Sequence, residues 1–349
     1  MKRIKDFIKK TLLVDEGPKP LFSRKLTSPI KKINKNNFEY YEYGNLNEDK
    51  TFYVINRSSH AGIFSYLSFV LNHLYIAKQN NFIPVVDMEN FTNPYNEIDK
   101  INNTFNSWEY YFNQTSNHSL EEVYNSKNVI FSRNDFHKNM NYMIHLEPKF
   151  RDLKEKEIRL KQECIDYVTN YFKKNSLDNK KILGIHFRGT SYKTSRGHVF
   201  PATIKQIKKY VDDLLSYENF DKIFICTEEK NYLDFFIKNY SEKLLYIDSY
   251  RSDKNDAFTK YNRKHHRYKL GDESVKEALI LSKCSSLLFV RSNIINAANF
   301  FSKNEQCLYE IFNGFNSRNQ FIARFLWFIK KYLPRNFFGL EDKLLKSKN

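Results

Sequence analysis

A set of mostly polar residues follows the apolar segments in the second half of the chain, at the points where predicted strands end. The set consists of His186, Arg188, Gly189, Thr190, Thr227, Ser292 and Asn293. An arginine offers two parallel donors to a phosphate, and the start of a helix offers N–H groups to anions. Because Ser292 and Asn293 open a helical pattern, the set predicts a site for a phosphorylated ligand, with Arg188 supplying the charge.

The elements that must position this set alternate along the chain. Apolar runs typical of buried strands occupy 182–187, 222–226, 244–247 and 286–290, and helical patterns occupy 204–215, 232–240, 274–283 and the stretch from 294. A polar loop is expected over 248–271. The alternation predicts a parallel sheet with helices on both faces, a doubly wound Rossmann-like domain. Ligands of such sheets bind beyond the carboxyl ends of the strands, which is where the polar set lies.

The first half of the chain also predicts α/β structure, with strands at 51–56, 82–86 and 128–132 and a helix over 63–79. A polar stretch at 175–181 marks the expected domain boundary. We predict an N-terminal α/β domain over 1–178, a Rossmann-like domain over 179–317 and a basic amphipathic segment over 318–349. Two such domains facing a cleft are typical of many nucleotide-sugar transferases, and also of two-domain dehydrogenases and kinases.

The positive charge of the chain is concentrated at its two ends. The 349 residues carry a net charge of +17, from 57 Lys and Arg against 40 Asp and Glu. Residues 1–37 contribute 11 − 3 = +8 and residues 318–349 contribute 8 − 2 = +6, which leaves +3 for the rest. A nucleic-acid partner is therefore not expected. Both ends mix basic with apolar residues, which predicts either a helix bound to an anionic membrane surface or a docked helix with solvated lysines.

The absence of several motifs excludes further classes of function. No stretch approaches the roughly 20 apolar residues of a membrane span and no signal peptide is evident, so we expect a cytoplasmic protein. The four cysteines form no CxxC pair, which argues against a zinc ribbon or a disulfide framework. Residues 184–191 nearly match a phosphate loop but lack its lysine, and no GxGxxG follows a strand. For Asp87 and Glu89, which follow one predicted strand, we favour a structural role over a metal site, so no metal or other cofactor is expected.

Three motifs stand in order in the second half of the chain. The string 186–191 reads His-Phe-Arg-Gly-Thr-Ser, the apolar strand 223–229 ends in Thr-Glu-Glu, and 274–301 place Glu277 on a helix before the next strand. A His-Arg-Tyr string at 266–268 precedes the third motif. In order and spacing these motifs resemble those of the α1,6-fucosyltransferases and protein O-fucosyltransferases, which use GDP-fucose. The resemblance covers about 181–302 and implies a GT-B-like fold, two Rossmann-like domains facing a cleft.

The resemblance implies a role for each matching residue. Arg188 would bind the β-phosphate and offset the charge on departing GDP, and Glu277 would accept the N1–H and N2–H groups of guanine. The residues that would line the donor are His186, Gly189, Thr190, Thr227, Arg267, Ser292 and Asn293. In the first half, Gly62 would allow close approach of the sugar or diphosphate, or only a tight turn. From the residues alone, Arg188 can instead pair with Glu228 or Asp248, and Glu277 can be an exposed helix carboxylate.

The chain departs from the family pattern at three points. Gly189 replaces a second arginine, Ser191 replaces an aspartate, and the stretch 194–198 holds no counterpart of the family's proposed glutamate base. Histidine suits proton transfer near neutral pH, so His198 is one candidate base. The other candidates are carboxylates of the polar loop expected over 248–271, namely Asp248, Asp253 and Asp256.

We therefore expect a metal-independent inverting transferase that moves fucose from GDP-fucose to a glycan or a lipid-linked glycan. Heavy use of Lys, Asn, Ile, Phe and Tyr, whose codons are rich in A and T, indicates an AT-rich bacterial genome and hence surface polysaccharide synthesis. The basic ends would hold the protein on the inner face of the plasma membrane. Two alternatives remain open: a transferase of the same fold using another nucleotide sugar, and a non-catalytic protein that binds anionic polymer or membrane.

Overall fold

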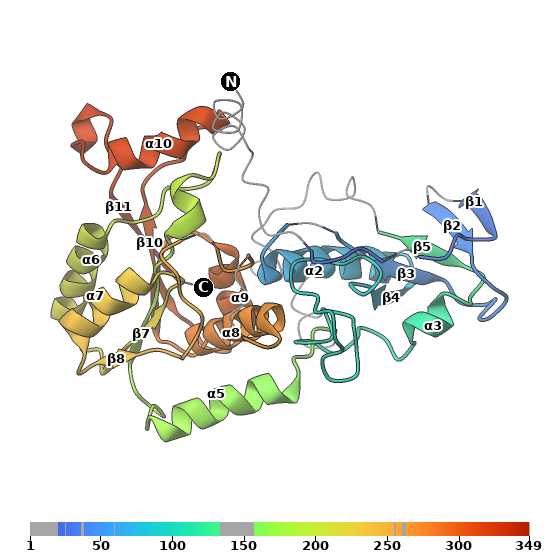
Figure 1. The fold of residues 1–349 in the computed structure, drawn as a ribbon. Helices are drawn as coiled ribbons and strands as arrows, with labels where there is room; N and C mark the ends of the chain where they lie inside the picture. The colour runs from blue at the N-terminus through green and yellow to red at the C-terminus, as the bar shows by residue number, and fades with distance from the viewer. Residues whose placement is uncertain are drawn as a thin grey trace. The chain divides into compact units, whose positions relative to one another are not determined.

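The computed structural model describes residues 20–24, 26–35, 38–58, 60–132, 157–254, 256–259 and 263–348. These residues form two compact units. Unit 1 holds the described residues within 170–260 and 277–349, and unit 2 holds those within 18–169 and 261–276. Each unit is built on one sheet with helices packed against it (Figure 1), so the α/β class is confirmed in both. The expectation for the basic N-terminal segment falls mostly on 1–19, which lie outside the described residues.

The sheet of unit 1 has six strands, five of them parallel. They are β6 (Ile182–His186), β7 (Lys222–Cys226), β8 (Leu244–Leu245), β9 (Ser286–Phe289), β10 (Cys307–Phe312) and the antiparallel edge strand β11 (Lys343–Lys348). Their spatial order is β8-β7-β6-β9-β10-β11. In this order the chain moves outward from β6 in one direction and then restarts beside β6 with β9, which is the topological switch point of doubly wound sheets. The predicted parallel sheet is thus confirmed, and its switch point lies between β6 and β9.

Helices cover both faces of this sheet. The helices of this part of the chain are α5 (Gln162–Lys174), α6 (Ile204–Tyr217), α7 (Lys230–Tyr240), α8 (His266–Leu281), α9 (Asn293–Phe301) and α10 (Gln320–Lys330), with the short turns η4 (Thr190–Lys193) and η5 (Arg335–Phe337). Helices α6 and α7 lie on one face, and α8 and α9 lie on the other (Figure 1). Helix α6 begins at a capping box, in which Thr203 and Gln206 satisfy each other's backbone N–H groups.

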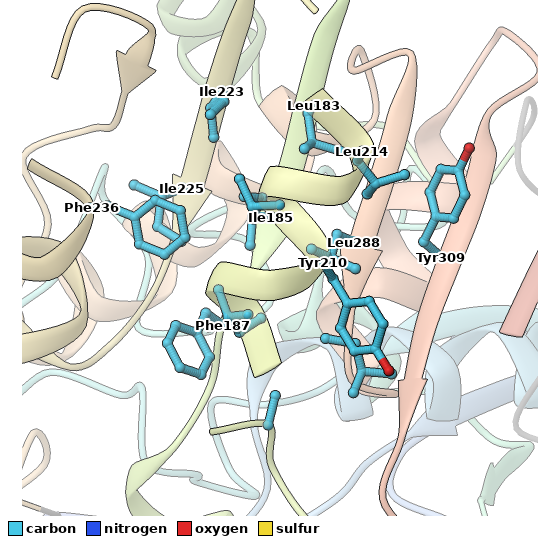
Figure 2. Close-up of a cluster of buried hydrophobic side chains, with 14 of the residues drawn as sticks. Leu183, Ile185, Phe187, Tyr210, Leu214, Ile223, Ile225, Phe236, Leu288 and Tyr309 are labelled. Carbon is cyan, nitrogen blue, oxygen red and sulfur yellow. The ribbon is translucent and has the colours of Figure 1, made fainter. Parts of the chain in front are cut away.

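Side chains alternate along β6 and fill both layers. Leu183, Ile185 and the following Phe187 belong to a buried cluster that includes Leu214 of α6 and Phe236 of α7 (Figure 2). Gly184, between Leu183 and Ile185, faces the opposite side of the sheet. A Cβ added there would lie 2.7 Å from Leu287 Cδ2 and 2.9 Å from Leu281 Cδ2. Because real Cβ atoms do not approach this closely, glycine is needed for α8 to pack on β6.

Helix α8 begins at His266, well before the predicted start at Ser274. The reason is a long-range contact within unit 2. The Tyr111 ring stacks on the Tyr268 ring with centroids 5.8 Å apart, and the Tyr111 hydroxyl donates to the Tyr268 carbonyl at 3.0 Å. Tyr111 also fills the space beside Gly271. These contacts stabilise a turn whose local sequence, charged and with a glycine, favours a loop.

Unit 2 contains a mixed five-stranded sheet in the order β1-β2-β5-β3-β4. Its elements are β1 (Lys31–Lys35), β2 (Phe38–Glu42), β3 (Phe52–Ile55), α2 (Ile63–Gln79), β4 (Ile83–Val86), α3 (Leu120–Val123) and β5 (Val129–Phe131). The helix and the three strands predicted for this half are present. Strand β3 is parallel to β4 and β5, whereas β2 is antiparallel to β5 and to β1, so the sheet is only partly parallel.

Candidate active site

His186 and Ser292 meet at the switch point of the unit 1 sheet. His186 ends β6, and Ser292 is the N-cap of α9, just after β9. Their side chains are joined by a hydrogen bond of 3.2 Å between Ser292 Oγ and His186 Nδ1. The Ser292 hydroxyl makes no capping bond to its own helix. The first turn of α9, which Asn293 begins, therefore presents its positive end at the carboxyl edge of the sheet.

His186 acts here as a neutral group. It is 5% exposed, and burial together with the charge of Arg188 lowers the pKa of His186 to about 3. At pH 7 the imidazole is uncharged, so it orients Ser292 without attracting a phosphate. Arg188, two residues further along the chain, carries a positive charge that an anionic ligand could use at this edge.

Arg188 follows β6 by two residues and lies among three polar or aromatic groups. Its Nε is 3.2 Å from Glu228 Oε2, and its Nη2 donates to Ser191 Oγ at 3.4 Å. The guanidinium carbon lies 4.2 Å from the centre of the Tyr192 ring. The ion pair with Glu228 expected from the residues is present. With 33% of the side chain exposed, the guanidinium remains accessible to a ligand at this edge.

The two glutamates after β7 hold the residues that follow Arg188. The Thr190 hydroxyl donates to Glu228, and the Thr190 N–H donates to Glu229. Glu229 is 3% exposed, and Lys193 Nζ donates to its two carboxylate oxygens at 2.7 and 2.9 Å. The same carboxylate occupies the space where a Cβ at Gly189 would lie. The Glu229 carboxylate therefore leaves no room for a side chain at position 189.

We expect Gly189→Ala to lower the free energy of unfolding by about 1–3 kcal/mol, because the new Cβ must push the Glu229 carboxylate away from Lys193 and Thr190. Thermal unfolding followed by circular dichroism measures the change. Gly62→Ala is the matched control, since a Cβ there meets no described atom within 4 Å and the φ of −74° is open to any residue. Identical unfolding midpoints for both variants would show that Glu229 does not constrain this position.

His198 lies on the loop after η4, beside the Tyr192 ring that also contacts Arg188. The centroids of the His198 and Tyr192 rings are 5.0 Å apart, and Asn316 N–H donates to the His198 carbonyl at 2.8 Å. Partial burial, and secondly the charge of Arg188, lower the pKa of His198 from its ordinary value of 6.5. The residue still keeps an exposed surface, so solvent screens part of this effect. His198 is therefore neutral at pH 7 and able to accept a proton.

Glu277 is buried rather than exposed on its helix, at 7%. Cys226 Sγ, at the end of β7, donates to Glu277 Oε2 at 3.3 Å, and Ser249 Oγ donates to Oε1 at 3.2 Å. Arg251 Nη2 lies 3.6 Å from Oε1, and Arg251 Nε donates to the Thr227 carbonyl at 3.1 Å. Arg251 thus joins Glu277 to Thr227 at the carboxyl end of β7, and a base bound by Glu277 would compete with Ser249 and Arg251.

Two other predicted donor-binding residues belong to unit 2 and are not among the residues that unit 1 brings together. Arg267 is 3% exposed, and its Nη1 donates to the Pro94 carbonyl at 2.6 Å. Gly62 is the N-cap of α2, in an extended conformation. Asp87, also in unit 2, accepts from Asn90 N–H at 2.8 Å and from the Tyr124 hydroxyl at 2.6 Å, which are the contacts of a loop-fixing carboxylate.

Sequence reasoning placed Glu228 and Glu229 at the end of a strand without assigning them to the site, and it did not select Arg251. Glu228 and Glu229 follow Thr227 directly, so their position after a strand was the available signal. Arg251 lies in an irregular loop and had no such signal. Within the described ranges, no group of three or more His, Cys, Asp and Glu is arranged to hold a metal ion.

The strand order of unit 1 and the polar cluster at its switch point define a doubly wound α/β fold. No protein-family model matches the chain, and no curated protein matches its sequence. Among solved structures, the chain is similar to the fucosyltransferase NodZ from Bradyrhizobium, at 12% identity and a TM-score of 0.48, over 75% of this chain and 94% of NodZ. It is also similar to POFUT1 in complex with GDP-fucose, at 9% identity and a TM-score of 0.41, over 73% and 94% of the two chains. A variant of FUT1 from Arabidopsis thaliana in complex with GDP gives 9% identity and a TM-score of 0.39, over 75% and 70%.

Proposed function

We propose that the protein is a glycosyltransferase that transfers fucose from GDP-fucose to a glycan. The observation that carries the proposal is the hydrogen bond that joins His186, two residues before Arg188, to Ser292 at the start of α9, at the switch point of unit 1. The charge of Arg188 acts on His186, and His186 is bonded to the N-cap of α9. A guanidinium and a helix N-terminus at this edge suit a diphosphate. The resemblance of the three sequence motifs supports GDP-fucose as its source.

In the proposed reaction an acceptor hydroxyl attacks the anomeric carbon of fucose, and the bond from that carbon to the β-phosphate oxygen breaks with inversion. The electron pair of the broken bond leaves with GDP. Arg188 and the N–H groups at the start of α9 stabilise the charge that develops there, without a metal ion. The proton of the acceptor hydroxyl passes to the neutral imidazole of His198. The His198 ring and the Arg188 guanidinium both contact the ring of Tyr192.

We also propose which part of the chain binds each substrate and where in the cell the protein acts. Residues 179–317, Arg267 among them, would bind the donor, and residues 1–178 would supply the acceptor side, with Gly62 allowing close approach of the sugar or diphosphate. The acceptor would be a glycan or a lipid-linked glycan of bacterial surface polysaccharide synthesis in the cytoplasm. The A/T-rich codon usage implied by the composition supports the bacterial setting.

The proposal predicts that the protein binds GDP and GDP-fucose in EDTA and binds UDP and CDP at least about tenfold more weakly, because Glu277 accepts from guanine. Titration calorimetry measures this preference. Glu277→Gln should remove most of the preference, since an amide cannot accept both N–H groups of the base. The matched control is Glu305→Gln, a carboxylate that is 60% exposed and paired only at the surface with Lys348.

Two outcomes would contradict the proposal. Equal affinity for GDP, UDP and CDP in the wild-type protein would favour a transferase that uses another nucleotide sugar. No affinity for any nucleotide would favour a non-catalytic binding protein. If Glu277→Gln instead lowered the unfolding midpoint and kept the preference for GDP, Glu277 would be a structural partner of Cys226 and Ser249 only.

A further inference from the structure

Helix α10 has two apolar faces, of which one is packed against the protein. On the packed face Ala323 is 0% and Trp327 is 5% exposed, and Trp327 Nε1 donates to the Pro201 carbonyl at 3.0 Å. Trp327 forms a buried cluster with Phe200 and Leu340. The other face holds Phe321, Ile322, Phe325, Phe328 and Ile329, each between 43% and 58% exposed. At about 100° per residue these five side chains cover about 120° of the helix, on the side opposite Ala323 and Trp327.

The exposed apolar surface continues into the turn after α10. Tyr332, Leu333, Phe337 and Phe338 are 79%, 41%, 66% and 87% exposed. We call these four residues and the five of the helix the α10 face. In the described part of the chain, nine of the twenty-one exposed large hydrophobic residues therefore fall within residues 321–338. Helix α10 and the turn that follows it lie at one end of unit 1 (Figure 1). Apolar surface gathered in this way marks an interaction site more often than a solvated surface.

The charges around the α10 face indicate what kind of partner it binds. Residues 318–340 contain five basic residues and no acidic residue. The five are Arg318, Arg324, Lys330, Lys331 and Arg335. Aromatic and aliphatic side chains flanked by Lys and Arg are the pattern of helices that lie in the interface of an anionic bilayer. A second copy of the chain fits less well, because a two-fold contact would bring ten positive charges together with no acidic counterpart.

We infer that the α10 face binds the surface of an anionic lipid bilayer, with α10 lying in the plane of the interface. None of the described helices is long and apolar enough to cross a membrane, so the contact would be peripheral. The inference goes beyond the proposed transferase activity and does not depend on it. Lys193, the partner of Glu229, lies 5.4 Å from the centre of the Trp327 ring, so the packed face of α10 meets the candidate donor site and the bilayer would lie on the opposite side of the helix.

The test is co-sedimentation of the full-length protein with extruded vesicles in about 0.15 M NaCl. One set of vesicles is phosphatidylcholine alone, and the other contains about one third phosphatidylglycerol. We expect at least about tenfold stronger binding to the anionic vesicles and a loss of that binding at higher salt. The double variant Phe325→Glu/Ile329→Glu should bind at least about tenfold more weakly. The matched control is Tyr217→Glu, an 85% exposed aromatic outside the α10 face, which should bind as the wild type does.

Folding and nucleotide binding are checked separately. The substituted side chains are exposed, so circular dichroism should give the wild-type spectrum and unfolding midpoint, and GDP titration should be unchanged. A second variant, Lys330→Gln/Arg335→Gln, should weaken binding to anionic vesicles and leave the weak binding to neutral vesicles as it was. Wild-type affinity in the Phe325→Glu/Ile329→Glu variant would overturn the inference. An absence of vesicle binding by the wild-type protein would also overturn the inference. If the wild type then dimerised in sedimentation velocity and the double variant did not, the α10 face would be a contact between two copies of the chain.

Discussion

Replacing Arg188 by alanine is expected to lower the rate of fucose transfer about 10²–10³-fold and to weaken GDP binding about 10–100-fold. The guanidinium is a partly exposed positive charge that follows β6, and His186, which is bonded to the N-cap of α9, is neutral at pH 7. Loss of this charge removes both a charge-assisted contact to the diphosphate and the stabilisation of departing GDP. Calorimetry with GDP and a transfer assay with GDP-fucose measure the two effects.

A second variant, which removes Glu228 from its ion pair with Arg188, distinguishes a structural role of Arg188 from this functional role. Glu228→Gln removes the carboxylate 3.2 Å from Arg188 Nε and leaves the guanidinium in place. If Arg188 binds phosphate, this variant should bind GDP as well as the wild type or better, because a competing anion is gone. If Arg188 only holds the strand ends together, both variants should lower stability and GDP affinity alike, and the proposed site would be wrong.

Replacing His198 by glutamine is expected to lower kcat about 10²–10⁴-fold, the usual contribution of a positioned base, while GDP affinity stays unchanged. A base must be deprotonated to act, so activity is present above its pKa and is lost as the pH falls through that value. The pKa of His198 lies below 6.5, because burial and Arg188 both disfavour the imidazolium. The wild-type rate should therefore fall below pH 6.5, and the variant should lose this acid limb. A pH profile of single-turnover rates measures both effects.

The alternative bases are carboxylates of the loop after β8. Asp253 Oδ1 already accepts from Asn231 N–H at 2.9 Å, near the start of α7, and Asp256 is 9% exposed. Asp248 is exposed and is the carboxylate to compare. An unchanged rate in His198→Gln together with a large loss in Asp248→Asn would assign the base to Asp248. A loss in His198→Gln without a change in the pH profile would indicate a positioning role for the loop.

The polar cluster at the carboxyl edge of unit 1 illustrates what sequence reasoning can reach. Each apolar run of about five residues between helical patterns became a parallel strand, and the polar residues after β6 and β9 meet as His186 and Ser292. Local periodicity is enough for this, because burial on both faces of a parallel sheet demands continuous apolar runs. The parallel strand β10 was not predicted, and neither was the antiparallel edge strand β11. The side chains of β11 lie largely in solvent at the sheet edge, so its sequence lacks an apolar pattern.

The sequence by itself determined the doubly wound α/β class of unit 1 and the position of Arg188 after the first strand of that unit. Tertiary structure decided which neighbours these residues have. The start of α8 depends on Tyr111, the space at Gly189 depends on Glu229, and the link from Thr227 to Glu277 depends on Arg251. The amphipathic pattern of α10 likewise predicted a helix, but only packing against Phe200 decided which of its apolar faces is buried and which meets solvent. Such contacts join residues far apart in the chain, whereas periodicity records only which side of its own element a residue faces.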